Sequence, residues 1–191
     1  MAQYVYLVRH GETSLNADGR LRGLADPELN ELGESQARAV AVALANVDAG
    51  IVVSSPLRRA VHTAATIADH AGIAHQIDDR FNDRDYGRWT GAVKSEVVAE
   101  WGSVDAAPGV EPMHTVLSRS APALDAWGAW SESRHKAVVV VTHDAVIRPL
   151  LARIAPSLPA VSVPTASYQV LRYDTGIWSV ELTDQQAPPL E

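Results

Sequence analysis

The chain has 191 residues, a formal net charge of −7 and no cysteine. Its length suits one domain with its own hydrophobic core, and a composition of 47% hydrophobic and 20% charged residues is that of an ordinary globular protein. A sequence without cysteine excludes a disulfide framework, a thiolate metal site and a cysteine nucleophile. The acidic balance argues against a nucleic-acid partner, which would require a basic surface.

The start of the chain predicts neither a signal peptide nor a membrane anchor. Its apolar stretch, residues 4–8, ends at Arg9 and His10 and has no basic residue before it. No other stretch approaches the ~18 apolar residues that a membrane span needs. We therefore expect a cytoplasmic protein with no membrane partner.

Short apolar runs alternate with segments of helical periodicity. The strongest runs are continuous rather than alternating, which is typical of strands buried on both faces: residues 4–8, 51–53 and 138–141. Residues 75–77 are a weaker strand, and residues 168–173 and 178–182 are expected to form a closing hairpin.

Helices are expected between these strands, at about residues 32–47, 55–70, 93–101, 113–132 and 145–154. Ser55 is the expected N-cap of the second helix, because Pro56 suits the first helical position. Gly72 is expected to end that helix. Two stretches, residues 16–30 and 78–92, are expected to be loops without helices.

This order of elements predicts an α/β fold, a three-layer α/β/α sandwich with a largely parallel central sheet. We expect residues 1–184 to form a single domain in which residues 92–130 are a variable lid. Residues 185–191 are expected to be a frayed tail. In such a fold the active site lies at the carboxyl ends of the strands.

Two histidines and two arginines fall at these strand ends. Arg9 and His10 follow the first strand, Arg59 lies just after the second, and His143 follows residues 138–141. The ends of parallel strands converge, so these side chains should share one pocket. Guanidinium groups match phosphate oxygens, and histidine serves as a nucleophile, base or donor, so a phosphate dianion is the simplest ligand.

The segment Leu7-Val8-Arg9-His10-Gly11-Glu12-Thr13 resembles the opening motif of the histidine phosphatase superfamily, also called the phosphoglycerate-mutase-like family. Residues 54–60, which read Ser-Ser-Pro-Leu-Arg-Arg-Ala, are similar to its second arginine motif, and residues 140–143 to its second-histidine strand. The resemblance covers most of the chain, and it implies one histidine-phosphatase domain with a phosphoglycerate-mutase-like fold.

The resemblance also implies a mechanism. His10 would attack the phosphorus and become a phosphohistidine, while Arg9, Arg59 and His143 would hold the phosphoryl oxygens. A carboxylic acid would protonate the leaving oxygen. No metal or other cofactor is implied, because cationic side chains carry the charge that Mg²⁺ carries elsewhere.

The acid is the point where the sequence departs from the family. The family usually has a glutamate four residues before a glycine, and here Asp83 stands four residues before Gly87. Aspartate is one methylene shorter, so either this loop moves inward or another carboxylate, Asp85 or Asp144, serves instead. We favour Asp83. Asp144 remains a rival because it follows the second histidine, as the donor aspartate does in the acid-phosphatase branch.

These residues predict a metal-independent phosphomonoesterase that acts on a small phosphorylated metabolite. Further candidates for substrate binding are Asn16, Arg22, Arg84 and Asp144. Two alternatives stay open, a cofactor-dependent phosphoglycerate mutase and a catalytically silent protein that binds a phosphorylated ligand. Mutases of this family usually carry an extra segment between the acid and the second histidine, and the short region here favours the phosphatase. A homodimer is the assembly that the resemblance suggests.

Overall fold

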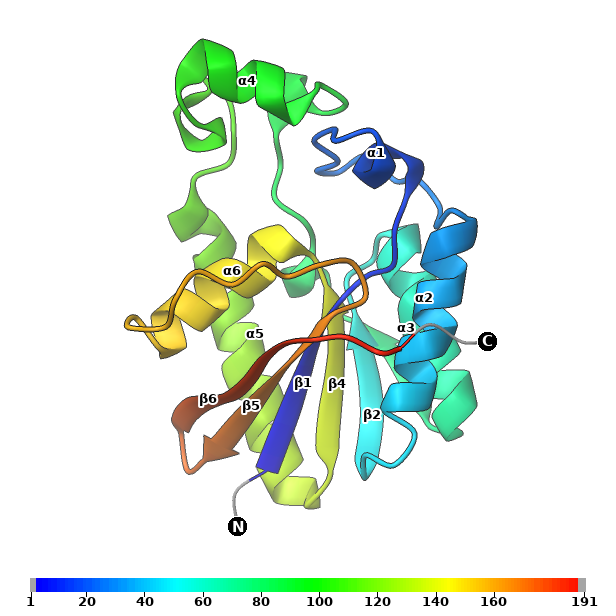
Figure 1. The fold of residues 1–191 in the computed structure, drawn as a ribbon. Coiled ribbons are helices and arrows are strands. Elements are labelled where there is room, and N and C mark those ends of the chain that lie inside the picture. Colours follow the sequence, from blue (N-terminus) through cyan, green and yellow to red (C-terminus); the bar gives the residue numbers. More distant parts are fainter. Residues whose placement is uncertain (1–2, 189–191) are drawn as a thin grey trace.

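The computed structural model describes residues 3–188 and shows a six-stranded sheet between two layers of helices (Figure 1). The strands lie in the order β3-β2-β4-β1-β5-β6 and are β1 (Gln3–Arg9), β2 (Ala49–Ser54), β3 (Ala74–Ile77), β4 (Ala137–Thr142), β5 (Tyr168–Asp174) and β6 (Ile177–Gln185). The first four strands run parallel, and β5 is antiparallel to both β1 and β6. The predicted α/β/α sandwich with a largely parallel sheet is confirmed.

Six α-helices lie within residues 3–188: α1 (Ser14–Ala17), α2 (Glu31–Ala43), α3 (Arg58–Ala71), α4 (Lys94–Trp101), α5 (Met113–Arg134) and α6 (Asp144–Ile154). Helices α2 and α3 cover one face of the sheet, and α5 and α6 cover the other (Figure 1). Three short 3₁₀ turns follow β3 and α4: η1 (Asp79–Phe81), η2 (Gly87–Trp89) and η3 (Val104–Ala106). None of the described helices is both long and apolar enough to span a membrane.

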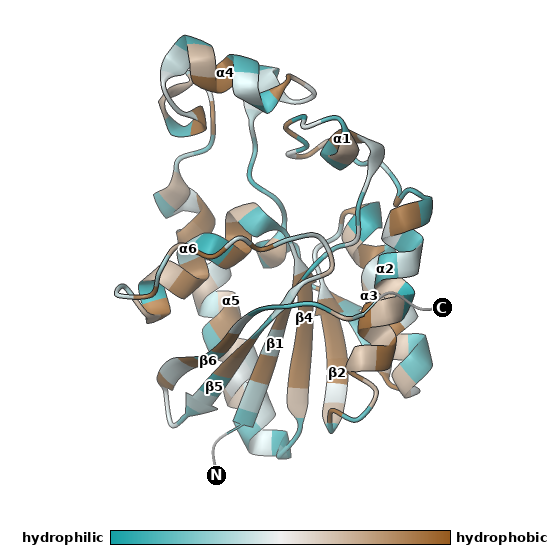
Figure 2. Cartoon of the chain, viewed as in Figure 1, coloured by the Kyte–Doolittle hydropathy of each residue, from teal (hydrophilic) through white to brown (hydrophobic). Residues whose placement is uncertain are grey.

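Strand β4 shows why the apolar runs are continuous. Val138 and Val140 pack into the core under α5 and α6, whereas Val139 and Val141 pack toward α2 and α3. Successive side chains of a strand point to opposite faces, so a strand covered on both faces must be apolar at every position. All the residues of β4 are buried, and Figure 2 shows the central strands as the most hydrophobic part of the ribbon.

The predicted start of the second helix is wrong. Helix α3 begins at Arg58 with Leu57 as its N-cap, so Ser55 does not cap it. The backbone at Ser55 instead continues alongside β4, because its N–H donates to the Val141 carbonyl at 3.0 Å. The predicted end is confirmed, since Gly72 follows the helix in the left-handed conformation that glycine adopts without strain.

Two other predicted boundaries differ from the structure. The short helix α1 lies partly in the expected loop of residues 16–30. Strand β6 ends at Gln185, which is the first residue of the expected tail. Residues 189–191 of that tail lie outside the described part of the chain.

The expected lid, residues 92–130, divides into two parts. Helix α4 lies apart from the sheet, at the top of Figure 1, in a small apolar cluster with Leu21, Tyr86 and Ala107. Helix α5 instead packs into the main core through residues such as Leu124 and Trp127. Only the part before α5 therefore forms a separate body over the carboxyl end of the sheet.

The loop after β1 passes against the first turn of α2 at two glycines. A Cβ atom on Gly33 would lie 2.0 Å from the carbonyl oxygen of Glu12, and one on Gly11 would lie 2.4 Å from the carbonyl oxygen of Gly33. Side chains do not tolerate such distances, so only glycine lets the two backbones approach this closely. The position of His10, which precedes Gly11, depends on this contact.

We expect Gly33→Ala to lower the free energy of unfolding by about 1–3 kcal/mol, because the added methyl group must displace the Glu12 backbone. Alanine inside a helix is otherwise favoured over glycine by about 1 kcal/mol, so a loss of stability in Gly33→Ala identifies the clash. Urea denaturation measures the effect. The control Arg38→Ala, on the exposed side of α2, should change stability by less than about 0.5 kcal/mol. An unchanged or raised stability for Gly33→Ala would contradict the close approach.

Candidate active site

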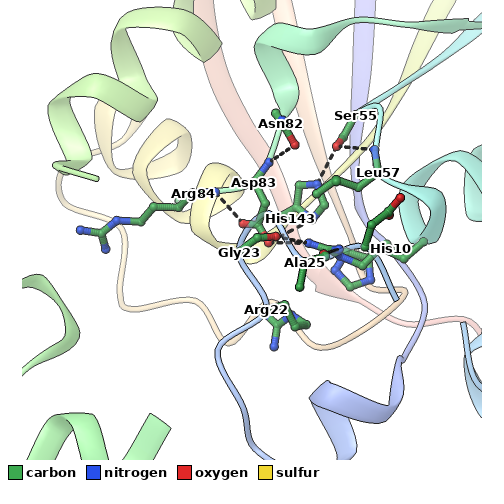
Figure 3. A network of polar contacts seen from close by, with 12 residues as sticks. His10, Arg22, Gly23, Ala25, Ser55, Leu57, Asn82, Asp83, Arg84 and His143 are labelled. Carbon is green, nitrogen blue, oxygen red and sulfur yellow. Dashed lines mark hydrogen bonds and ion pairs between the residues drawn. The ribbon is translucent and has the colours of Figure 1, made fainter. Parts of the chain in front are cut away.

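The structure brings Arg9, His10, Arg59 and His143 together at the carboxyl end of the sheet. Strands β1 and β4 are parallel neighbours with Arg9 opposite Thr142, so the two histidines leave the sheet at the same edge. The N–H of His10 donates to the Thr142 carbonyl at 3.0 Å. The imidazole centroids lie 5.1 Å apart, and Figure 3 shows both rings beside Asp83.

The contacts of His10 define its tautomer. Its Nδ1 lies 2.7 Å from the carbonyl oxygen of Gly11, which can only accept, so Nδ1 carries the proton and Nε2 has a lone pair. This Nε2 is buried and has no hydrogen-bond partner within residues 3–188. Burial, together with the positive charges of Arg59 and Arg9, lowers the pKa of His10 well below its usual range. The side chain is therefore a neutral imidazole with a free nitrogen, the form that a histidine nucleophile requires.

His143 is oriented by Ser55. The Oγ atom of Ser55 accepts from the N–H of Leu57 at 3.4 Å and forms a hydrogen bond with Nε2 of His143 at 2.8 Å. The other ring nitrogen, Nδ1, lies 3.4 Å from Oδ2 of Asp83, and a proton on Nδ1 would point toward this acceptor. Burial lowers the pKa of His143 well below its usual range, and the charge of Arg59 adds to this effect. His143 is thus a neutral imidazole.

Three arginines surround the histidines, and each is held through its terminal nitrogens. Their Nη groups donate to protein oxygens: Arg9 to Val163 O (2.7 Å), Arg22 to Asp144 Oδ1 (3.0 Å), and Arg59 to Ala25 O (2.7 Å), Gly23 O (2.9 Å) and Asp83 Oδ2 (2.8 Å). In all three side chains the Nε atom is buried and has no partner within the described residues.

The site therefore gathers five buried nitrogens that have no hydrogen-bond partner within residues 3–188: Nε of Arg9, Arg22 and Arg59, Nε2 of His10 and Nδ1 of His143. An unsatisfied buried polar group costs about 1–3 kcal/mol, so such groups rarely cluster without a purpose. The arginines make the site positive, and their donors suit a ligand with several oxygens. A phosphoryl group has this charge and this set of acceptors.

The carboxylates near the site differ in their electrostatics. Asp83 is buried and accepts from Arg59 Nη2 and from the Arg84 N–H, both at 2.8 Å. Burial raises its pKa above the usual value, although Arg59 opposes this shift. At Asp144 burial acts in the same direction, but the charges of Arg9 and Arg22 outweigh it and hold the pKa below the usual value. Asp85 is exposed.

Two predicted substrate-binding residues are engaged elsewhere. Asn16 Oδ1 accepts from the N–H and the hydroxyl of Thr13 at 3.1 and 2.9 Å and so caps α1. The guanidinium of Arg84 donates to Asp105 and to the carbonyl of Glu111, and it points away from His10 in Figure 3. Their contact with substrate stays a prediction. Within residues 3–188 no group of three or more His, Cys, Asp or Glu side chains is arranged to hold a metal ion.

The sequence analysis missed three residues that support the site. Ser55 orients His143, as described above. Thr63 accepts from the N–H of Gly11 at 3.1 Å and donates to the carbonyl of Arg59 at 2.8 Å. Its place one helical turn after Arg59, on the buried face of α3, was the available signal. Arg119 of α5 contacts the backbone that carries Asp83, and no sequence pattern indicated this.

Comparisons with known proteins agree with this geometry. The profile of the histidine phosphatase superfamily (branch 1) matches residues 5–186. The chain is 31% identical over 182 residues to a glucosyl-3-phosphoglycerate phosphatase of Mycobacterium tuberculosis, and this match covers 85% of the chain and 79% of that protein. It is also 31% identical over 192 residues to a metal-independent phosphoserine phosphatase of Arabidopsis thaliana, covering 93% and 79%.

A solved structure supports the fold. A phosphoglycerate mutase of Bacillus anthracis superimposes with a TM-score of 0.88 over 96% of this chain and 93% of that one, at 22% identity. The predicted phosphoglycerate-mutase-like fold and the predicted phosphatase family are both confirmed by these matches. On its motifs, its fold and its relatives, the chain belongs to the histidine phosphatase superfamily, branch 1.

Proposed function

We propose that the chain hydrolyses the phosphate monoester of a small metabolite without a metal ion, through a phosphohistidine on Nε2 of His10. One observation carries this proposal. His10 is neutral and buried with a free Nε2, and it feels the charges of three arginines whose Nε atoms have no hydrogen-bond partner within residues 3–188. A nucleophile inside a set of cationic donors is arranged to attack an electrophile whose oxygens those donors hold.

In the first step Nε2 of His10 attacks phosphorus, and the bond from phosphorus to the leaving oxygen breaks. Arg9, Arg59 and Nδ1–H of His143 hold the phosphoryl oxygens as charge moves onto them. Asp83, in its protonated form, gives its proton to the leaving oxygen, which departs as the alcohol. The raised pKa of Asp83 favours this role over Asp144, whose pKa is lowered.

In the second step water replaces the alcohol. Asp83 is now a carboxylate and takes a proton from the water as the oxygen attacks phosphorus. The bond from phosphorus to Nε2 breaks, inorganic phosphate forms, and His10 and Asp83 return to their starting states. The sum is a phosphate ester plus water giving an alcohol plus phosphate.

The substrate, the assembly and the location are proposed from the relatives, the family resemblance and the composition. The names of the relatives suggest phosphoserine and phosphoglycerate-type esters as first substrates to test. The family resemblance supports a homodimer, and a sequence without cysteine fits the cytoplasm. Asn16, Arg22, Arg84 and Asp144 remain the proposed substrate contacts.

The proposed function predicts phosphate release that continues in EDTA and that His10→Ala abolishes. We expect a loss of about 10³-fold or more, because no other group replaces the nucleophile. Release from p-nitrophenyl phosphate, phosphoserine and 3-phosphoglycerate is the measurement. His114→Ala changes an exposed histidine and should retain activity. Isomerised phosphoglycerate, formed only with a bisphosphate primer, would favour the mutase. Tight phosphate binding without turnover would favour the silent protein.

For the general acid, we expect Asp83→Asn to lower kcat on an alkyl phosphate by about 10²–10⁴-fold, because the leaving alkoxide then receives no proton. Asp144→Asn should have a smaller effect, since the carboxylate of Asp144 pairs with Arg22. Steady-state kinetics of both variants provides the comparison. The reverse order of losses would assign the acid to Asp144.

Stability should fall as the pH is lowered from 7 toward 5. His10 and His143 have depressed pKa values in the folded state, whereas in the unfolded chain they titrate near 6.5. Below about pH 6.5 the unfolded state therefore binds more protons, and stability falls by up to about 1.4 kcal/mol per pH unit for each histidine. Urea denaturation in phosphate-free buffer should show a flatter dependence for His10→Asn/His143→Asn than for wild type. His114→Asn is the control. If stability depended on pH equally steeply in wild type and in His10→Asn/His143→Asn, this would argue against buried neutral histidines.

A further inference from the structure

Asp83 lies on an irregular segment between η1 and η2, yet its carboxylate is held on both oxygens. The side chain of aspartate is short, so the position of this carboxyl group depends on the position of the backbone. Neither a helix nor a strand fixes that backbone. The contacts that hold it therefore decide whether the acid reaches the site.

One guanidinium group holds most of this segment. Nη1 of Arg119, on α5, donates to the carbonyls of Arg80 and Asn82 at 3.0 and 2.6 Å, and Nη2 donates to the carbonyl of Asp83 at 2.9 Å. Nη2 also lies 3.4 Å from Oε2 of Glu111. Three carbonyls, one in η1 and two on the irregular segment that follows it, thus converge on one side chain of a helix that belongs to the main core.

Glu111 closes the segment on the carboxyl side of Asp83. Its Oε2 accepts from the N–H of Asp85 at 3.0 Å, and its own N–H donates to the carbonyl of Asp85 at 2.8 Å. From the sheet, the hydroxyl of Thr142 donates to the carbonyl of Phe81 at 2.7 Å. The segment is therefore held at both ends, and Arg119 holds its centre.

We propose that Arg119 is a positioning residue, which fixes the backbone of Asp83 so that its carboxyl group stays between Arg59 and His143. This inference rests on the proposed role of Asp83 as the general acid. Arg119 contacts the backbone of Asp83 and not its carboxylate, so it acts through geometry. Lysine could replace it only in part, because one ammonium group lacks the planar fork that reaches several divergent carbonyls.

The test compares substrates with different leaving groups. A good leaving group such as p-nitrophenolate needs no proton, whereas the alkoxide of glycerol phosphate does, and phenyl phosphate lies between them. We expect Arg119→Met to lower kcat/KM about 10- to 100-fold on glycerol phosphate and less than about threefold on p-nitrophenyl phosphate. Arg119→Lys, which keeps the charge, should show the same order of substrates with a smaller loss of kcat/KM.

Controls separate positioning from folding. Arg134→Met, at an exposed arginine of the same helix, should leave all three rates unchanged. Rates are expressed per folded site, counted by the labelling of His10 with phosphate. In the Asp83→Asn background, Arg119→Met should cause no further loss, because the group it positions is already absent.

Three results would overturn the proposal, and they have different meanings. If Arg119→Met lowered kcat/KM equally on all three substrates, the role of Arg119 would be merely structural. A leaving-group dependence in Asp83→Asn but not in Arg119→Met would keep the acid and remove the positioning role. Equal rates of Asp83→Asn and wild type on glycerol phosphate would remove the acid assignment itself, and the role of Arg119 with it.

Discussion

The burial of two histidines beside three arginines is the constraint on which this site depends. Three guanidinium groups surround two buried imidazoles, and burial together with these charges keeps both rings neutral. The arginines are tolerated because carbonyls and the carboxylates of Asp83 and Asp144 hold their terminal nitrogens. Their Nε donors remain without a hydrogen-bond partner within residues 3–188. The same electrostatics therefore keeps His10 unprotonated, as a nucleophile must be, and favours the binding of an anionic substrate.

The pKa values of two carboxylates of the site are shifted in opposite directions although the groups are chemically identical. Burial dominates at Asp83 and raises its pKa, whereas Arg9 and Arg22 dominate at Asp144 and lower its pKa. A group that must give a proton and take it back benefits from the first environment, and a fixed counter-ion benefits from the second. This difference supports one division of work, with Asp83 as the acid and Asp144 as the partner of Arg22.

The scaffold determines how accurately these groups meet. Parallel strands β1, β2 and β4 deliver their carboxyl ends to one edge, and the approach of Gly11 and Gly33 sets the loop that carries His10. The segment of Asp83 has no such regular support and depends on side chains from elsewhere, above all on Arg119. Preorganised donors and a well-placed acid are what the proposed chemistry requires.

The sequence by itself determined the layers, the strand ends and the family, because apolar runs such as residues 138–141 and the motifs around His10, Arg59 and His143 are local patterns. Only the tertiary structure decided that Ser55 orients His143 rather than capping a helix, that α5 belongs to the core rather than to the lid, and that Arg119 holds the backbone of Asp83. Local periodicity reports which face of an element is buried. A contact between side chains far apart in the chain depends on how the elements pack, and no periodicity encodes it.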